Sequence, residues 1–328
     1  MREIQLPLNQ TQKIRLQRAL EKLESLSSKL TSNATVTIAD PIPVNYEDGV
    51  LKGHGTSELD GQVVATLCGV VERVNKLVYV RSLRSRYKPE TGDIIVGRVV
   101  EVAQKRWRLE INSNQDAVLM LSSVTLPDGI QRRRTAVDEL NMRNIFEEND
   151  VISAEVRNLQ HDGTLQLHAR SDKYGKLERG QLLSVSSYLV KRRKQHFHQL
   201  DQYGVLLILG CNGYVWVGEL VEAKDRMEVD QVNQSEEANM KPCSYMSLEE
   251  TEPNYTPLET RRNICRIANA VRVLSILGFN ITIEVILEIF ELSISENVDV
   301  HDMLGAEFCV RVAEKEADRR SMATKRKG

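Results

Sequence analysis

Three short runs of basic residues are the most distinctive chemical feature of the sequence. Lysine and arginine neutralise phosphate groups, so cations presented together are typical of proteins that bind nucleic-acid backbones. One basic run alone is usually a solvated surface, whereas three runs beside an oligonucleotide-binding barrel favour RNA. The candidate RNA-binding residues are Lys105, Arg106, Arg108, Arg132, Arg133, Arg134, Lys191, Arg192, Arg193 and Lys194.

Trp107 lies inside the first basic run and has two possible roles. An exposed tryptophan could stack on a base. Trp107 alternates in phase with Leu109 and Ile111, however, which favours a place in a hydrophobic core. In that case Arg106 and Arg108 point to the opposite face of the strand, where a phosphate could reach them.

The string Gly210-Cys211-Asn212-Gly213 fits the Gly-x-x-Gly loop with which KH domains hold nucleotide backbones. That loop joins two helices, whereas this string lies between the strand-like runs 205–209 and 214–217. Asn-Gly is also a preferred hairpin turn. We therefore interpret the string as a structural turn and keep the RNA clamp as the alternative.

The sequence contains none of the common catalytic motifs. Gly-x-Ser-x-Gly, a Walker loop, Gly-x-Gly-x-x-Gly after a strand and His-Glu-x-x-His are all missing. The five cysteines are scattered and never form Cys-x-x-Cys, which argues against disulfides and zinc. His196-Phe197-His198 offers two imidazoles without further ligands nearby. We predict a protein that is not an enzyme and has no metal or other cofactor.

The first half of the chain reads as a helix followed by two β-domains. Leucines at helical spacing predict an amphipathic helix at 14–30, in a segment 1–48 that ends as a polar linker. This helix either packs on its own chain or docks on a partner. A small β-domain follows at 49–90. Residues 91–171 then contain five short strands, at 94–102, 107–111, 117–121, 151–159 and 164–169.

A short helix is expected before the fourth of these strands, because Thr135 and Asp138 have capping-box spacing. Five strands with a helix before the fourth are the plan of the OB-fold barrel. The remaining region, 172–328, combines a strand at 182–186 and a hairpin at 205–217 with helices at 259–277, 282–292 and 300–320. The predicted fold class is multidomain, mainly β plus α+β, with a KH-like C-terminal domain.

The formal net charge of −2 is an average over segments of opposite sign. Residues 219–258 hold ten acidic against three basic residues, a local charge of −7, which leaves +5 for the rest of the chain. We read this segment as an acidic insertion of unassigned role. No apolar run approaches the roughly 20 residues of a membrane-spanning helix, so we expect a soluble intracellular protein without membrane contact.

Several longer strings, in order along the chain, resemble the RNA-binding cap subunits of the eukaryotic RNA exosome. Coverage runs from about residue 53 to 217. The strings are RVNKLVYV at 73–80, RSRY at 84–87, GD at 92–93, VGR at 96–98, QKRW at 104–107, LSS at 121–123, RRR at 132–134, DEL at 138–140, ISAEV at 152–156, YGKL at 174–177, LVKR at 189–192 and ILGCNGYVWV at 208–217.

The resemblance implies an N-terminal β-domain, an S1-type OB barrel and a KH domain. It also implies a subunit without an active site that sits on a ring of RNase-PH-like subunits beside other cap subunits and guides RNA. Associated nucleases would then carry out 3′-to-5′ rRNA processing, RNA degradation and mRNA decay, in nucleus, nucleolus and cytoplasm. The alternative is a free-standing RNA-binding regulator.

Matching strings outside the barrel suggest where the chain would contact such a ring. We expect the ring-subunit contact residues to be Leu77, Tyr79, Arg81, Arg84, Arg86 and Tyr87. The sequence does not indicate which RNAs are preferred.

Overall fold

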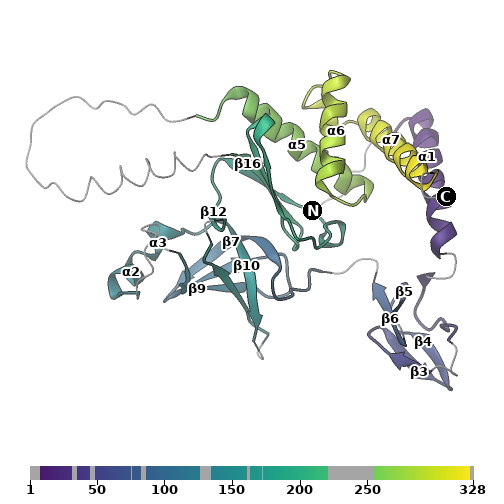
Figure 1. The fold of residues 1–328 in the computed structure, drawn as a ribbon, viewed down its shortest axis with the longest axis horizontal. Helices are drawn as coiled ribbons and strands as arrows, with labels where there is room; N and C mark the ends of the chain where they lie inside the picture. Colours follow the sequence, from purple (N-terminus) through teal and green to yellow (C-terminus); the bar gives the residue numbers. More distant parts are fainter. Residues whose placement is uncertain are drawn as a thin grey trace, which may run out of the picture. The chain divides into compact units, whose positions relative to one another are not determined.

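The computed structural model describes residues 8–31, 35–44, 49–74, 76–82, 86–125, 134–160, 163–171, 173–220 and 255–325 (Figure 1). Contacts divide the chain into two compact units. Unit 1 comprises residues 1–85 and 304–328, and unit 2 comprises residues 86–303. Most of the predicted acidic insertion, 221–254, lies outside the described residues.

Unit 1 contains a small β-domain built from two sheets. A four-stranded sheet has the order β1 (Thr35–Val36), β5 (Gly69–Val74), β6 (Leu77–Ser82), β2 (Leu51–Lys52), and β3 (Thr56–Leu59) pairs with β4 (Gln62–Ala65). Alternate aliphatic residues of β4 and β6 form its core together with Ile42 of the segment after β1: Val63, Ala65, Val78 and Val80. Gly69 is required for close strand approach, because a Cβ there would lie 2.1 Å from the Arg81 carbonyl oxygen.

The two terminal helices of unit 1 pack against each other. They are α1 (Gln10–Thr31) and α7 (Ala306–Lys325). The Arg15 guanidinium lies 2.9 Å from Glu307 and 2.7 Å from Glu314, while Lys22 lies 2.6 Å from Asp318. The N-terminal helix, left open between its own chain and a partner, therefore packs on the C-terminal helix.

Unit 2 begins with a closed five-stranded barrel, as predicted. Its strands are β7 (Ile94–Ala103), β8 (Arg106–Glu110), β9 (Ala117–Val124), β10 (Val151–Leu159) and β11 (Leu165–Ala169). The order is β11-β9-β8-β7-β10, and β11 closes the barrel by pairing with β10. Two short helices, α2 (Ala136–Leu140) and α3 (Met142–Ile145), precede β10. A short strand, β12 (Gly175–Lys176), pairs with Ile152 and Ser153 of β10.

Two features predicted from the sequence, the capping box before β10 and the core position of Trp107, are present in the structure. Thr135 and Asp138 form the expected capping box, with the Thr135 amide donating to the Asp138 carboxylate at 2.7 Å. Trp107 is fully buried and its indole N–H donates to the Phe146 carbonyl at 3.1 Å. The core position of Trp107 is confirmed, because its neighbours in phase, Leu109 and Ile111, are buried with it.

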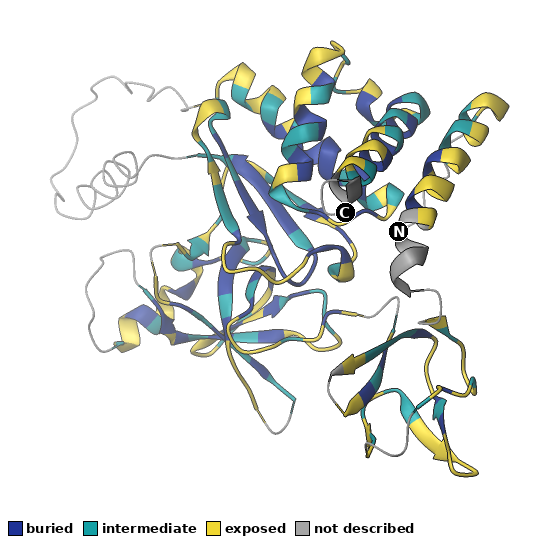
Figure 2. Cartoon of the chain, turned by 45° about the vertical axis from the view of Figure 1, so that its right-hand side comes forward, coloured by how far each residue is buried: buried dark blue, intermediate teal, exposed yellow. Residues whose placement is uncertain are grey.

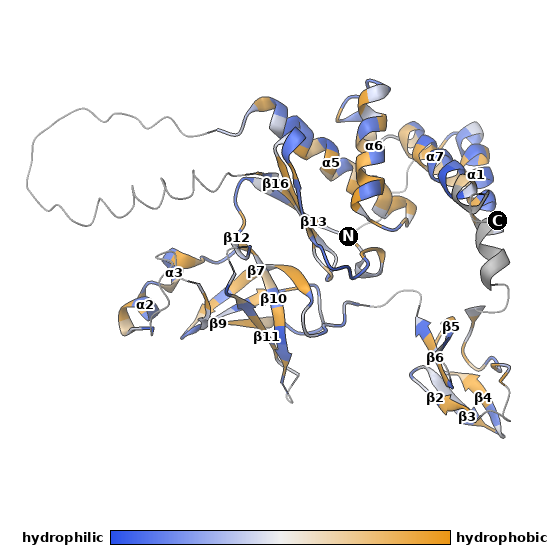
Figure 3. Ribbon diagram, viewed as in Figure 1, coloured by the Kyte–Doolittle hydropathy of each residue, from blue (hydrophilic) through white to orange (hydrophobic). Residues whose placement is uncertain are grey.

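The KH-like part of unit 2 is an antiparallel sheet with helices. The sheet order is β13 (Gly180–Ser184), β16 (Tyr214–Glu219), β15 (Val205–Leu209), β14 (Phe197–Leu200). Short 3-10 turns cover Ser187–Leu189, Asp201–Tyr203 and Asp302–Leu304. The central strands are largely buried (Figure 2). Helices α5 (Leu258–Leu277) and α6 (Ile283–Ser295) follow, and α6 is mostly hydrophobic (Figure 3).

None of the helices in the described segments has the length and apolar character needed to cross a bilayer.

The ion pairs between α1 and α7 give a first prediction. Arg15→Glu places a third carboxylate against Glu307 and Glu314, so we expect α1 to detach more often and its amides to exchange with solvent several-fold faster. Hydrogen exchange followed by mass spectrometry measures this directly. Arg18→Glu is the matched control, because Arg18 lies exposed on the same helix. Equal exchange of α1 in both variants would show that these ion pairs do not hold the helix.

Candidate nucleic-acid interface

The outer face of β8 and β9 carries the first basic run. Trp107 and Leu109 point into the barrel, so Arg106 and Arg108 point outward. The strand register places Arg106 beside Met120 and Arg108 beside Val118. In OB folds, this face and the loop between the first two strands bind oligonucleotides. The arginines thus occupy the position where such a barrel meets its ligand.

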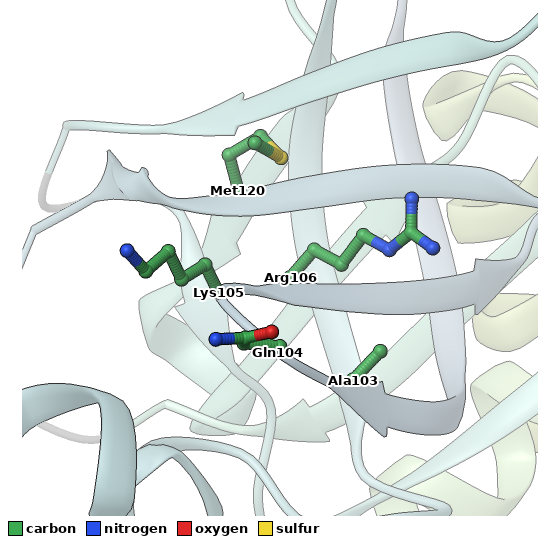
Figure 4. Close-up of a pocket in the computed structure, with 5 residues that line it drawn as sticks. All are labelled: Ala103, Gln104, Lys105, Arg106 and Met120. Atoms are coloured by element: carbon green, nitrogen blue, oxygen red, sulfur yellow. The ribbon is translucent and has the colours of Figure 1, made fainter.

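A depression of about 490 Å³ lies at the edge of this face (Figure 4). Its lining comes from the β7–β8 turn and from β9: Ala103, Gln104, Lys105, Arg106 and Met120. The sequence did not point to Gln104 or Met120. Only the OB-fold rule for the first hairpin loop could have indicated them.

Lys105 stands in the left-handed backbone region, with φ of +62°. A side chain in this region is strained, and such positions are often retained where function needs them. The turn holds this geometry because the Lys105 carbonyl accepts the Leu121 amide at 3.0 Å. The Lys105 ammonium lies 3.0 Å from Glu139 of α2.

The cations on this face differ in how they are paired. Arg108 lies 3.0 Å from Glu101 and 3.3 Å from Asp116. Arg106 is exposed and has no carboxylate partner among the described residues. Exposed pairs are weak and exchange readily for a phosphate. Arg106 is therefore the cation most available to a phosphate, with Lys105 and Arg108 next to it.

The second basic run is only partly described. Arg132 and Arg133 lie outside the described residues, so their RNA role stays a prediction. Arg134 donates from its guanidinium to the carbonyl oxygens of Leu121 (3.2 Å) and Val124. These bonds make Arg134 a brace for the end of β9.

In the third basic run, two residues form ion pairs within the chain and two are exposed. The Arg192 guanidinium lies 2.8 Å from the Asp93 carboxylate and also donates to the Lys88 carbonyl at 2.8 Å. Arg193 pairs with Glu284 at 2.9 Å. Lys191 and Lys194 flank them and are exposed. Arg192 and Arg193 thus hold parts of unit 2 together, and an RNA role for the four residues of this run stays a prediction.

Asp93 is buried at the centre of a polar network between the barrel and the KH-like part. It accepts hydrogen bonds from Arg192, from the Tyr87 hydroxyl at 2.7 Å and from the Glu90 amide at 3.1 Å. Burial alone raises the pKa of Asp93, but these bonds outweigh it and the pKa lies below its usual range. Burial and the bond to Asp93 raise the pKa of Tyr87.

This network corrects one expectation and leaves others untested. Tyr87 is 4% exposed and belongs to the barrel core, so it offers no surface to a ring subunit. Arg84 lies outside the described residues. Arg86 is exposed and donates to the Asn114 amide oxygen at 3.2 Å. On β6 of unit 1, Leu77, Tyr79 and Arg81 share one face because Val78 and Val80 are buried on the other.

The Gly-x-x-Gly string is a buried turn between β15 and β16, as interpreted from the sequence. Asn212 is fully buried, and its amide donates to the Val96 carbonyl at 2.7 Å and the Ile111 carbonyl at 2.9 Å. Gly210 packs closely against the backbone of Tyr214, because a Cβ at Gly210 would lie 2.4 Å from the Tyr214 carbonyl oxygen. The string packs on the barrel, which leaves it no access to a nucleotide backbone.

His196 and Cys211 lie behind the same turn. His196 is buried, with Nδ1 2.6 Å from the Leu209 carbonyl oxygen and Nε2 accepting the Arg193 amide at 3.2 Å. These contacts place Nδ1 to donate and Nε2 to accept. Burial raises the pKa of Cys211 to about 12, so its sulfur, 3.6 Å from Nε2, is a thiol. Both ring nitrogens of His196 bond to backbone groups, so His196 and Cys211 have a structural role in this turn.

A five-stranded barrel with a cationic outer face, joined to a KH-type sheet, defines a protein of the S1/KH class. The profile described as RRP4, S1 domain matches residues 86–158, and one described as KH domain matches 180–222. The Exosome complex component RRP4 homolog of Arabidopsis thaliana is 64% identical over 327 residues, which cover 100% of this chain and 99% of that protein.

Other relatives agree over shorter stretches. Exosome complex component RRP4 of Saccharomyces cerevisiae is 36% identical over 291 residues, covering 83% of this chain and 80% of the relative. The mouse protein of the same name is 47% identical over 212 residues, covering 65% and 71%. The chain belongs to the RRP4 family of exosome complex components.

The burial of Asn212 gives a second prediction. Asn212→Ala leaves the Val96 and Ile111 carbonyls without their amide donor, so we expect the free energy of unfolding to fall by about 2–3 kcal/mol. Urea denaturation measures the change. Asn280→Ala, at an exposed position of unit 2, should change it by less than about 0.5 kcal/mol. A clamp would behave in the opposite way, losing RNA affinity at unchanged stability.

The Asp93 network predicts a pH dependence. The folded pKa of Asp93 is below its unfolded value of about 3.9, so its contribution to stability is present above about pH 4 and is lost as the pH falls through the folded pKa. We expect Asp93→Asn to be less stable than wild type at pH 7 and this difference to narrow below about pH 4. Urea denaturation at a series of pH values tests it. A difference independent of pH would contradict the assignment.

Proposed function

We propose that this chain is an RNA-binding cap subunit of the RNA exosome that guides RNA toward the ring and stabilises the complex. Membership of the RRP4 family supports the assignment to the exosome. The observation that carries the RNA-binding part is the cationic depression at the β7–β8 turn, where Arg106 stands exposed beside Lys105 and Met120.

The chemistry of this face suits single-stranded RNA read without strict sequence preference. Arg106, Lys105 and Arg108 offer charge to the phosphates, and Met120 offers an apolar surface beside them. The Gln104 amide can hydrogen-bond a base edge through either of its two polar atoms. Such a face binds the RNA backbone without selecting among the bases, which is what a subunit that guides many different RNAs requires.

We also infer that the chain is not a nuclease. Its sequence lacks a hydrolytic motif. The carboxylates on the RNA face, Glu101, Asp116 and Glu139, pair with Arg108 and Lys105, whereas catalytic metals need carboxylates grouped as their ligands. Degradation would then belong to associated nucleases working 3′ to 5′ in rRNA maturation and mRNA decay, in nucleus, nucleolus and cytoplasm. Magnesium-dependent trimming by the purified chain, lost on mutating one of its own carboxylates, would overturn this inference.

The outer face of β6 in unit 1 is our proposed contact to the RNase-PH-like ring. Leu77 is 37% exposed, and parallel pairing places it beside Leu51, which is 62% exposed. Tyr79 donates to Glu72 at 2.6 Å, and Arg81 pairs with the same carboxylate. An apolar pair flanked by an ordered charge network is the composition of a docking surface.

The RNA face gives a fourth prediction. Arg106→Ala should weaken single-stranded RNA binding alike for unrelated sequences and lower the slope of log K against log salt by roughly 0.7. Lys105→Gly should weaken it too without unfolding the turn, because glycine adopts positive φ freely. Titration by fluorescence anisotropy at several salt concentrations measures both. Arg143→Ala, a cation of α3 paired with Glu148, is the control. Wild-type affinity and slope in Arg106→Ala would remove this face from RNA binding.

The docking face gives a fifth prediction. Leu77→Glu combined with Arg81→Glu should abolish recovery of stoichiometric ring subunits with the tagged chain, because charge replaces the apolar contact. Leu59→Glu, at a more exposed leucine at the end of β3, should retain the ring. The recovered subunits are quantified by mass spectrometry. If the wild-type chain captures no ring subunits, it is a free-standing RNA-binding regulator. If the double variant captures them as wild type does, the contact lies elsewhere.

A further inference from the structure

A second cationic surface lies where the barrel meets the KH-like part. The Arg192 guanidinium donates to the Lys88 carbonyl at 2.8 Å, so the segment 86–90 lies beside the basic run 191–194 although about a hundred residues separate them. Glu90 also lies 3.4 Å from Arg192. Basic residues from two distant segments are thus gathered within unit 2.

The charges at this junction divide into a core and a rim. Arg192 pairs with Asp93 and Glu90 and donates to the Lys88 carbonyl, and Arg193 pairs with Glu284. Around them, the ammonium groups are exposed and have no carboxylate partner in the described part of the chain: Lys88, Lys191 and Lys194. Arg86 adds a fourth exposed cation, bonded to the neutral Asn114 amide. The rim therefore has positive charge that the fold does not neutralise.

An exposed aromatic side chain lies at the same junction. Tyr188 is 41% exposed in the 3-10 turn Ser187–Leu189. Its neighbour Ser187 packs on the Gly-x-x-Gly turn, because a Cβ on Gly213 would lie 2.9 Å from the Ser187 amide nitrogen. An aromatic ring beside spaced cations is the combination that binds single-stranded nucleic acid: bases stack and phosphates are neutralised.

We propose that this junction surface, formed by Arg86, Lys88, Tyr188, Lys191 and Lys194, binds a second stretch of single-stranded RNA. It takes the place of the KH clamp, whose Gly-x-x-Gly turn is buried against the barrel. Phosphates lie on the lysines and one base stacks on Tyr188, while Arg192 and Arg193 are positioning residues. The proposal rests on the proposed function and extends it to longer RNAs that span both surfaces.

Two RNA lengths separate this surface from the barrel face. An OB fold covers about 4–16 nucleotides, so an RNA of about 6 nucleotides fits the barrel face alone and one of about 20 reaches the junction. Lys88→Glu with Lys191→Glu should weaken binding of the long RNA about tenfold or more and lower its salt slope by roughly 1.4. The short RNA should bind as to wild type. Tyr188→Ala should weaken the long RNA, whereas Tyr188→Phe should not.

The control is Arg261→Glu with Arg262→Glu, two exposed cations of α5 in the same unit. Melting temperatures of all variants should match wild type. Unchanged long-RNA binding in the junction variant, with Arg106→Ala still weakening both RNAs, would overturn this inference and leave the proposed function standing. If neither the junction variant nor Arg106→Ala weakened RNA binding, both this inference and the proposed RNA-binding function would be wrong. Normal RNA binding with loss of exosome subunits would make the junction a protein contact and also overturn the inference.

Discussion

The side-chain amide of Asn212 is the contact on which the arrangement of unit 2 depends. Each of its two N–H groups reaches a carbonyl oxygen of the barrel, on Val96 and Ile111. The backbone carbonyl of Asn212 accepts the side-chain amide of Asn112 at 2.8 Å. Buried polar groups must be paired, so only one placement of the turn satisfies all of them. The KH-like sheet and the barrel are thereby fixed as one body.

Packing and charge support this single placement. Val96 of the barrel shares a hydrophobic cluster with Ile208 and Trp216 of the KH-like sheet. The pair of Asp93 and Arg192 adds a second polar link, and a buried pair of this kind contributes more to defining a unique geometry than to net stability. With the Gly-x-x-Gly turn occupied in this way, RNA chemistry is left to exposed faces of the same rigid unit.

The sequence predicted the local elements well because each has a periodic pattern. Trp107, Leu109 and Ile111 alternate as a barrel strand must, and the Thr135 to Asp138 spacing marked a helix start. The partners of the long-range contacts left no such pattern. Asn212 meets Val96 across 116 residues, and Arg15 meets Glu314 across 299. A basic run has the same sequence whether its arginines bind phosphate or groups of their own chain. The contacts of Arg134 with backbone carbonyls, and of Arg192 and Arg193 with carboxylates, could therefore be found only in the tertiary structure.

The central claim is that RNA lies on the barrel face and not in the Gly-x-x-Gly turn. Photo-crosslinking of the full chain to a single-stranded RNA of about 6 nucleotides that contains 4-thiouridine, a length that fits the barrel face alone, tests it most directly when the crosslinked peptides are identified by mass spectrometry. Crosslinks should fall within residues 103–108 and at Met120, and residues 210–213 should carry none. Crosslinks concentrated at Cys211 and Asn212, with the barrel face unlabelled, would contradict the account.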